Sequence, residues 1–319
     1  MKVHVESWDP TYGSAFEPGE PSPGPSQATT SRVEIGVELP PDAWRPLLPP
    51  EQVRPPATVL LIDGVRRIDG RIWVEDSDGT HPGVAASYAA GVVRCDLQAG
   101  VAEVIVTRVE RGLFTSSTRV GDLVAATGAV YRPHRVSRPE PMDLQQAVQR
   151  RMRELEMTVA AEARSRDSGG DDLLVVDGPL HGRTHLDRTV GYIKTHRTEY
   201  LPPALAAVVT SLPAGHRSPV FLLGTSWDRY AWYLRLPGAP GSPWAGVVRV
   251  ECTADVSRSV AIQLADISTV TLPRFASAAY KDPRAPQNLV PISGLERRLR
   301  SLLGDARLLN RALRAAVAG

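Results

Sequence analysis

Apolar residues follow one another almost without interruption over residues 57–62, and the run ends in Asp63 and Gly64. A run of this kind is typical of a strand that is buried on both faces of a sheet. Apolar and polar residues then alternate over residues 67–75, 87–95 and 102–109. We therefore expect a strand that ends in Asp63-Gly64, a turn and a second, antiparallel strand within residues 67–75, and further strands in meander order.

The period changes over residues 142–165, where apolar residues recur at spacings of three and four: Leu144, Val148, Met152, Leu155 and Val159. This spacing predicts an amphipathic helix of about six turns. A second apolar run, residues 172–176, ends in Asp177 and Gly178 as the first run ends in Asp63 and Gly64. Further helices are predicted near residues 201–212, 257–264 and 295–316, and further strands at 220–223, 230–236 and 245–252. This order of elements predicts an α/β fold with a mixed sheet.

The first 56 residues differ in composition from the rest, since they hold 12 of the 28 prolines. The proline-rich run at residues 17–26 cannot support a helix or strand pairing. We expect residues 1–56 to form a partly disordered or docking segment, and residues 57–319 to form the folded domain. Within the segment, residues 33–39 alternate like a short strand, and Trp44 is expected to pack on its own domain or on a partner.

Amino-acid composition excludes only a few classes of function for this chain. The chain is 42% hydrophobic, and its net charge of +2 is too small to predict nucleic-acid binding by itself. No apolar run is long enough for a membrane helix, and the first residues lack a secretory pattern, so we expect a cytoplasmic protein without membrane contact. Cys95 and Cys252 have no metal-binding spacing and are expected to be buried. Lysine occurs only at Lys2, Lys194 and Lys281, which makes the two internal lysines notable.

The two strand-terminal aspartates carry the first chemical hypothesis. A carboxylate at the end of a buried strand must reach solvent, be paired, or bind a metal ion. If the strands that end in Asp63 and Asp177 are parallel neighbours, the two side chains lie on the order of 5 Å apart. That separation suits a divalent cation. The alternative is that each Asp-Gly pair only forms a tight turn.

A third oxygen ligand is expected from the helix, which offers Glu154, Glu156 and Glu162. Counted back from the end of the helix, Glu154 and Glu156 lie level with Asp177 at the end of the following strand. Of these two, Glu156 projects closer to the apolar face of the helix. The alternative for Glu156 is a solvated helix face. Three carboxylates favour Mg²⁺ or Mn²⁺ over zinc.

Several stretches, in this order and spacing, resemble the NurA family of nucleases. They are Leu-Leu-Ile-Asp-Gly-Val-Arg-Arg at 60–67, Arg-Glu-Leu-Glu at 153–156, Leu-Leu-Val-Val-Asp-Gly-Pro-Leu at 173–180, Val-Gly-Tyr-Ile-Lys at 190–194, Trp-Tyr-Leu-Arg-Leu at 232–236 and Asp-Pro-Arg-Ala-Pro-Gln-Asn-Leu at 282–289. The resemblance implies an RNase H-like α/β fold with a mixed sheet core and flanking helices. It also implies a homodimer that cleaves DNA with Mn²⁺ or Mg²⁺, beside a HerA-type hexameric ATPase, in DNA repair or defence.

By motif, the resemblance places the metal ligands at Asp63, Glu156 and Asp177, and adds Lys194 to the catalytic set. The expected DNA contacts are Arg66, Tyr192, Lys194 and Arg235. Lys194 can act as a point charge on the scissile phosphate, and Arg235 as a bidentate clamp or simply as a solvated strand residue. Tyr192 lies among basic residues, as in single-strand binding surfaces, but also fits a strand edge.

One departure from the family keeps a second function open. Archaeal members carry a histidine or an acidic residue in the late segment, where this chain has residues 290–296 and only Glu296 as a substitute. The alternative is therefore a catalytically inactive DNA clamp or scaffold subunit of the same fold that docks on the ATPase. A third reading is an unrelated α/β protein whose aspartates only form turns.

Overall fold

The computed structural model describes residues 32–166, 170–180, 182, 186–238 and 241–317. The chain divides into two compact units. Unit 1 comprises Met1–Leu61, Cys95–Ala102 and Gly169–Ser293, and unit 2 comprises Ile62–Arg94, Glu103–Ser168 and Gly294–Gly319. The proline-rich run predicted at residues 17–26 lies outside the described residues.

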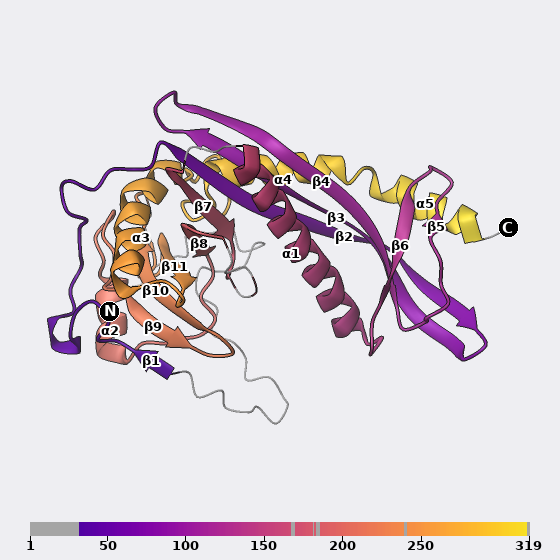
Figure 1. Cartoon of the computed structure of the whole chain (residues 1–319), viewed down its shortest axis with the longest axis horizontal. Helices are drawn as coiled ribbons and strands as arrows, with labels where there is room; N and C mark the ends of the chain where they lie inside the picture. Colours follow the sequence, from indigo (N-terminus) through magenta and orange to yellow (C-terminus); the bar gives the residue numbers. More distant parts are fainter. Residues whose placement is uncertain (1–31, 167–169, 181, 183–185, 239–240, 318–319) are drawn as a thin grey trace. The chain divides into compact units, whose positions relative to one another are not determined.

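Unit 1 is built on a mixed sheet. Its strands lie in the order β1 (Arg32–Glu34), β9 (Phe221–Gly224), β10 (Asp228–Arg235), β11 (Val247–Thr253), β8 (Thr189–Ile193) and β7 (Asp172–Asp177). Strands β7 and β8 pair in parallel, and the other pairs are antiparallel. The helices of this unit are α2 (Pro203–Thr210) and α3 (Arg258–Thr271), with the short 3₁₀ turns η2 (Pro41–Ala43) and η3 (Leu272–Phe275). Figure 1 labels these helices and strands.

Trp44 packs into the core of unit 1, which confirms the expectation that it docks on its own domain. Its ring lies 6.1 Å from that of Phe221, and the cluster also contains Tyr233 and residues of α2. The indole nitrogen of Trp44 donates a hydrogen bond to the carbonyl of Ile35 at 3.1 Å. The described end of the N-terminal segment is thus fixed by apolar burial and by one strand pair, β1 with β9.

Unit 2 contains the long strands of the protein. Its strands lie in the order β2 (Thr58–Asp76), β3 (Gly79–Asp96), β4 (Val101–Thr115), β6 (Val130–Arg135) and β5 (Leu123–Val124). Its helices are α1 (Pro141–Arg166), most of α4 (Val290–Leu302) and α5 (Ala306–Val317). In Figure 1, α1 runs alongside the long strands. The buried residues of α1 include the five apolar positions that predict it, from Leu144 to Val159.

The predicted strand end at Asp63-Gly64 and the separate antiparallel strand predicted at residues 67–75 are wrong, because both stretches lie in one continuous strand, β2. Gly64 is needed there for space: a Cβ at this position would lie 2.5 Å from Oε1 of Glu156 and 3.0 Å from Cγ of Met152. Gly178 behaves as predicted, since β7 ends at Asp177 and Gly178 has φ +105°. The same dipeptide therefore serves helix packing in one place and a turn in the other.

The single helix predicted over residues 295–316 is two helices. Gly304, with φ +78°, separates α4 from α5. The guanidinium of Arg67 on β2 donates to the carbonyl of Gly304 at 2.7 Å, and Asn310 of α5 donates to the carbonyl of Asp69 at 2.7 Å. Side-chain contacts with β2 hold this break, which helical periodicity alone does not reveal. The sequence pattern does not predict strands β5 and β6 either.

The predicted α/β class, with a mixed sheet and flanking helices, is confirmed. Cys95 and Cys252 are both buried and unbonded, as predicted. No helix in the described part of the chain has the length and apolar character needed to cross a membrane.

Candidate functional site

In unit 2, Asp63 and Glu156 both lie beside Gly64. The carboxylate of Asp63 accepts a hydrogen bond from the Gly64 amide at 2.8 Å. Glu156, on α1, is 2% exposed, and its Oε1 occupies the space that a side chain at Gly64 would fill. The missing side chain therefore lets a buried carboxylate from α1 approach β2.

The structure distinguishes Glu156 from the other two candidates on α1. Glu154 pairs with Arg151 on the exposed side of the helix. Glu162 pairs with Arg108 at 2.9 Å and with Arg166 at 2.5 Å. Glu156 alone of the three is buried against β2. This placement follows from helical spacing, since Glu156 lies four residues after the core residue Met152.

In unit 1, Asp177 and Lys194 form a close ion pair at the ends of β7 and β8. Lys194 Nζ lies 2.6 Å from Asp177 Oδ2, and the two side chains are 11% and 14% exposed. The parallel register pairs Asp177 with Tyr192. Lys194, two residues after Tyr192, therefore lies where its side chain can reach the Asp177 carboxylate. Lys194 is thus a nearly buried cation that offsets the charge of Asp177.

A second set of contacts fixes the ammonium of Lys194. It donates to Oδ1 of Asn288 at 3.0 Å, while Nδ2 of Asn288 donates to Asp282 Oδ2 and to Ser293 Oγ, each at 2.7 Å. The hydroxyl of Ser293 also donates to Asp282. Asn288 is 1% exposed, so both ends of its amide are used inside the protein. Sequence reasoning singles out the stretch 282–289 but gives Asn288 and Asp282 no role.

The turn after Asp177 is supported by a buried glutamate. Glu251 of β11 is fully buried, accepts a hydrogen bond from the Leu180 amide at 2.9 Å, and pairs with Arg229 at 3.0 Å. A Cβ at Gly191 of β8 would lie 2.9 Å from the carbonyl of Gly178 and 3.0 Å from Cγ of Glu251. Gly191 is therefore required for the close approach of the turn to β8.

The predicted DNA contact at Tyr192 does not fit its environment. Tyr192 is fully buried, and its hydroxyl donates to the carbonyl of Gln287 at 2.7 Å. Burial, and secondly the nearby Asp177 carboxylate, raise the pKa of this hydroxyl well above 10. A base cannot stack on a ring enclosed in this way, so Tyr192 is a core residue that supports β8.

The predicted phosphate clamp at Arg235 is corrected in the same way. Its guanidinium donates to the carbonyls of Ala245, Thr210 and Pro243 at 2.5, 2.8 and 2.7 Å. Burial lowers the pKa of this group from its usual value. Arg235 therefore ties loop carbonyls to the sheet of unit 1.

Arg66 remains accessible on β2. The residue is exposed, and its Nε donates to Gln149 of α1 at 2.7 Å. Glu296, the proposed substitute for the late histidine, pairs with Arg300 at 2.6 Å in the middle of α4.

Carboxylate oxygens such as those of Asp63 and Glu156 are the kind of ligand that Mg²⁺ or Mn²⁺ prefers. Within the described ranges, however, no three His, Cys, Asp or Glu side chains converge closely enough to hold a metal ion.

Comparison with known proteins identifies the family. The family model described as the NurA domain matches residues 67–292, which include Glu156, Asp177 and Lys194 and begin shortly after Asp63. Comparison with curated proteins gives no match.

Among solved structures, endonuclease V from Bacillus subtilis matches with 13% identity and a TM-score of 0.35, over 79% of this chain and 85% of that one. Human endonuclease V matches with 14% identity and a TM-score of 0.35, over 78% of this chain and 84% of that one. The catalytic domain of the human enzyme matches with 16% identity and a TM-score of 0.36, over 78% of this chain and 85% of that one. At these scores the likeness assigns no function.

Proposed function

The chain belongs to the NurA family, and we propose from this that it is a divalent-metal-dependent deoxyribonuclease. The observation that carries the proposal is the buried carboxylate of Glu156, which α1 places against β2 at Gly64, one residue after Asp63. Burying an ionised carboxylate is costly unless it is paired or binds a metal ion. The arrangement therefore favours a cationic ligand.

From family membership, we propose Asp63, Glu156 and Asp177 as metal-binding carboxylates, with Mn²⁺ or Mg²⁺ as the ion. When bound, such an ion acts as a Lewis acid and activates water for attack on phosphorus. Glu156 contributes a carboxylate whose position is fixed by burial, and Asp63 is oriented by the Gly64 amide. Fixed ligands of this kind lower the cost of organising the site during reaction.

Lys194 supplies a positive charge next to Asp177. Asn288 and Asp177 hold the ammonium in place. A lysine at such a position binds a phosphate oxygen as a point charge. Arg66, exposed on β2 in the other unit, is proposed as a further phosphate contact.

We also propose, from family membership, that the nuclease acts as a homodimer with a HerA-type hexameric ATPase in DNA repair or defence. Size-exclusion chromatography with light scattering, of the chain alone and mixed with the ATPase, tests both partnerships. A monomer that does not co-elute with the ATPase would contradict them.

Metal binding is tested by thermal unfolding with and without Mn²⁺. A ligand that binds only the folded state raises the melting temperature by mass action. We expect Mn²⁺ to raise it in the wild type and in Glu154→Gln, and to have little effect in Glu156→Gln. Glu154 is the matched control, since it lies on the same helix but pairs with Arg151 in solvent. An equal shift in both variants would contradict the assignment of Glu156.

A second candidate function is the inactive DNA clamp. The observation that favours it is the Lys194–Asp177 pair, because Asp177 already has a cationic partner. The clamp predicts salt-dependent DNA binding that survives Asp63→Ala, with neither Mn²⁺ stabilisation nor cleavage. The nuclease predicts DNA binding, Mn²⁺ stabilisation and cleavage together.

A further inference from the structure

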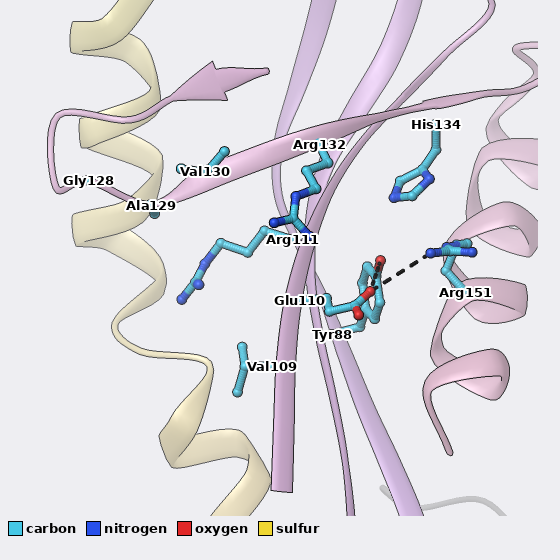
Figure 2. A pocket seen from close by; sticks show the side chains of 10 residues that line it. All are labelled: Tyr88, Val109, Glu110, Arg111, Gly128, Ala129, Val130, Arg132, His134 and Arg151. Carbon is cyan, nitrogen blue, oxygen red and sulfur yellow. Dashed lines mark hydrogen bonds and ion pairs between the residues drawn. The ribbon is translucent and has the colours of Figure 1, made fainter. Parts of the chain in front are cut away.

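A basic pocket of about 320 Å³ lies within unit 2, and neither Asp63 nor Glu156 lines it. Its lining residues come from β3, β4 and α1, and from β6 together with the turn that precedes it (Figure 2). The charged or hydrogen-bonding side chains that line it are Arg111, Arg132, Arg151, His134, Glu110 and Tyr88. Three guanidinium groups therefore face one carboxylate, which leaves the pocket with an excess of positive charge.

The one carboxylate is already committed. Glu110 accepts a hydrogen bond from the Tyr88 hydroxyl at 3.0 Å and lies 3.9 Å from the guanidinium of Arg151. In the described part of the chain, no carboxylate lies within ion-pair distance of Arg111 or Arg132. The Nε atom of Arg111 is buried with no hydrogen-bond partner among the same residues. Among the described residues, the charges of Arg111 and Arg132 are thus not offset by a paired carboxylate.

His134 is held at the wall of the pocket rather than free in solvent. Its ring stacks on Phe114 with 4.8 Å between centroids, and a Cβ at Gly112 would lie 2.6 Å from its Cδ2. Burial, and secondly the charge of Arg151, lower the pKa of His134, so the ring is neutral at neutral pH. The pocket is therefore rigid on this side and gains no charge from His134.

The basic groups are spread across the pocket instead of pointing at one centre. In the view of Figure 2, Arg111 extends to one side, Arg132 reaches over β4 in the middle, and Arg151 and His134 lie on the other side. A single small anion would be bound best by converging donors. A row of separate donors suits an anion with several phosphates, such as a nucleic-acid strand.

We propose that this pocket, through Arg111 and Arg132, binds backbone phosphates of the DNA strand on which the protein acts. The inference rests on the proposed DNA substrate but not on cleavage. The pocket and Glu156 share α1, on which Arg151 precedes Glu156 by five residues, or about 7.5 Å of helix rise. Phosphates held in the pocket would therefore position a strand in unit 2 near Glu156.

The test is the binding of a short labelled single-stranded oligonucleotide, followed by fluorescence anisotropy over a range of salt concentrations with EDTA present. We expect Arg132→Ala to weaken binding several-fold, and Arg111→Gln with Arg132→Ala to weaken it further. The slope of log K against log salt should become shallower by about 0.7 for each phosphate that the variant no longer neutralises. EDTA prevents cleavage, so the measurement does not depend on catalysis.

Arg135→Ala is the matched control. Arg135 is an exposed arginine at the end of the same strand, β6, but does not line the pocket, so its removal should change the slope little. Equal slopes in wild type and Arg132→Ala would overturn the proposal. Because Arg132 is exposed, this single variant is expected to fold even if the double variant does not.

Two further outcomes separate the pocket from the nuclease. If inorganic phosphate stabilises the wild type but not Arg132→Ala, while both bind DNA equally, the pocket takes free phosphate and the proposal is wrong. If the variants cleave DNA and bind it as the wild type does, the pocket assignment is wrong, while the proposed nuclease activity is supported.

Discussion

Gly64 is the residue that lets α1 place a carboxylate against β2. Its missing side chain leaves room for the carboxylate of Glu156. We expect Gly64→Ala to displace Glu156 and to destabilise the fold by about 1 to 3 kcal/mol through overpacking. Cleavage of DNA should fall in parallel. Urea unfolding and a nuclease assay measure the two effects.

Gly121→Ala provides the control for that substitution. Gly121 lies in the same unit, and a Cβ there would meet nothing within 4 Å. This variant should keep both stability and cleavage. If Gly64→Ala behaved in the same way, the close approach of Glu156 to β2 would be contradicted.

His196 is a second residue with a measurable consequence. It is almost fully buried, one ring nitrogen donates to the carbonyl of Val247 at 3.0 Å, and burial lowers its pKa to about 4. The unfolded chain therefore takes up this proton before the folded protein does, and its contribution to stability is lost as the pH falls from about 6.5 toward 4. We expect a loss of about 2 kcal/mol between roughly pH 7 and pH 5 from this group.

His196→Gln keeps a hydrogen-bond donor but removes the titration. Urea unfolding of wild type and variant at both pH values isolates the histidine, because other groups contribute equally to the two proteins. The variant should show the shallower dependence on pH. Parallel pH profiles would mean that His196 is not buried as a neutral ring.

The sequence predicts individual residue roles only where they follow from local spacing. Height and angle on a helix select Glu156, and the structure places it against β2. Tyr192 is assigned to DNA because its neighbours in sequence are basic or aromatic, and Arg235 because it matches an arginine of the family motif. Their burial depends on segments far along the chain, such as Gln287 for Tyr192, which no local pattern reveals. Asn288 is missed for the same reason, since its partner Lys194 is 94 residues away.

Among the elements, β2 and β7 show how one dipeptide takes two structures. Gly178 has φ +105° and open space around its Cβ position, whereas Gly64 has close contacts and stays in the strand. The apolar runs predict both strands. After Asp63 the course of the chain depends on packing against α1, whereas after Asp177 it depends on the backbone turn at Gly178. Helical periodicity likewise predicts α1 well and misses the break at Gly304, which Arg67 supports.

Gly178→Ala should therefore destabilise the protein through backbone strain and not through a clash. A side chain at this φ costs on the order of 1 kcal/mol or more. Gly36→Ala is the control, because Gly36 has neither a positive φ nor a neighbour within 4 Å of its Cβ position. Equal urea midpoints for the two variants would contradict the turn at Gly178.

In the whole molecule, the proposed catalytic residues are divided between the two units. Asp63 and Glu156 belong to unit 2, whereas Asp177 and Lys194 belong to unit 1. The sequence predicts the α/β class and the family, because both depend on the order of elements and motifs. It does not predict that Asp177 has a lysine partner, since that depends on the parallel register of β7 and β8.

Cleavage of end-labelled single- and double-stranded DNA with Mn²⁺, with and without the HerA-type ATPase, tests whether these residues form a nuclease. Wild type, Asp63→Ala, Asp177→Ala and the surface control Asp171→Ala should be compared, since Asp171 is exposed and its ion pair with Arg188, at 3.2 Å, lies in solvent. We expect Mn²⁺-dependent products from the wild type and Asp171→Ala, and none from the other two. Equal cleavage by Asp177→Ala, or no cleavage by any protein while DNA is still bound, would contradict the nuclease.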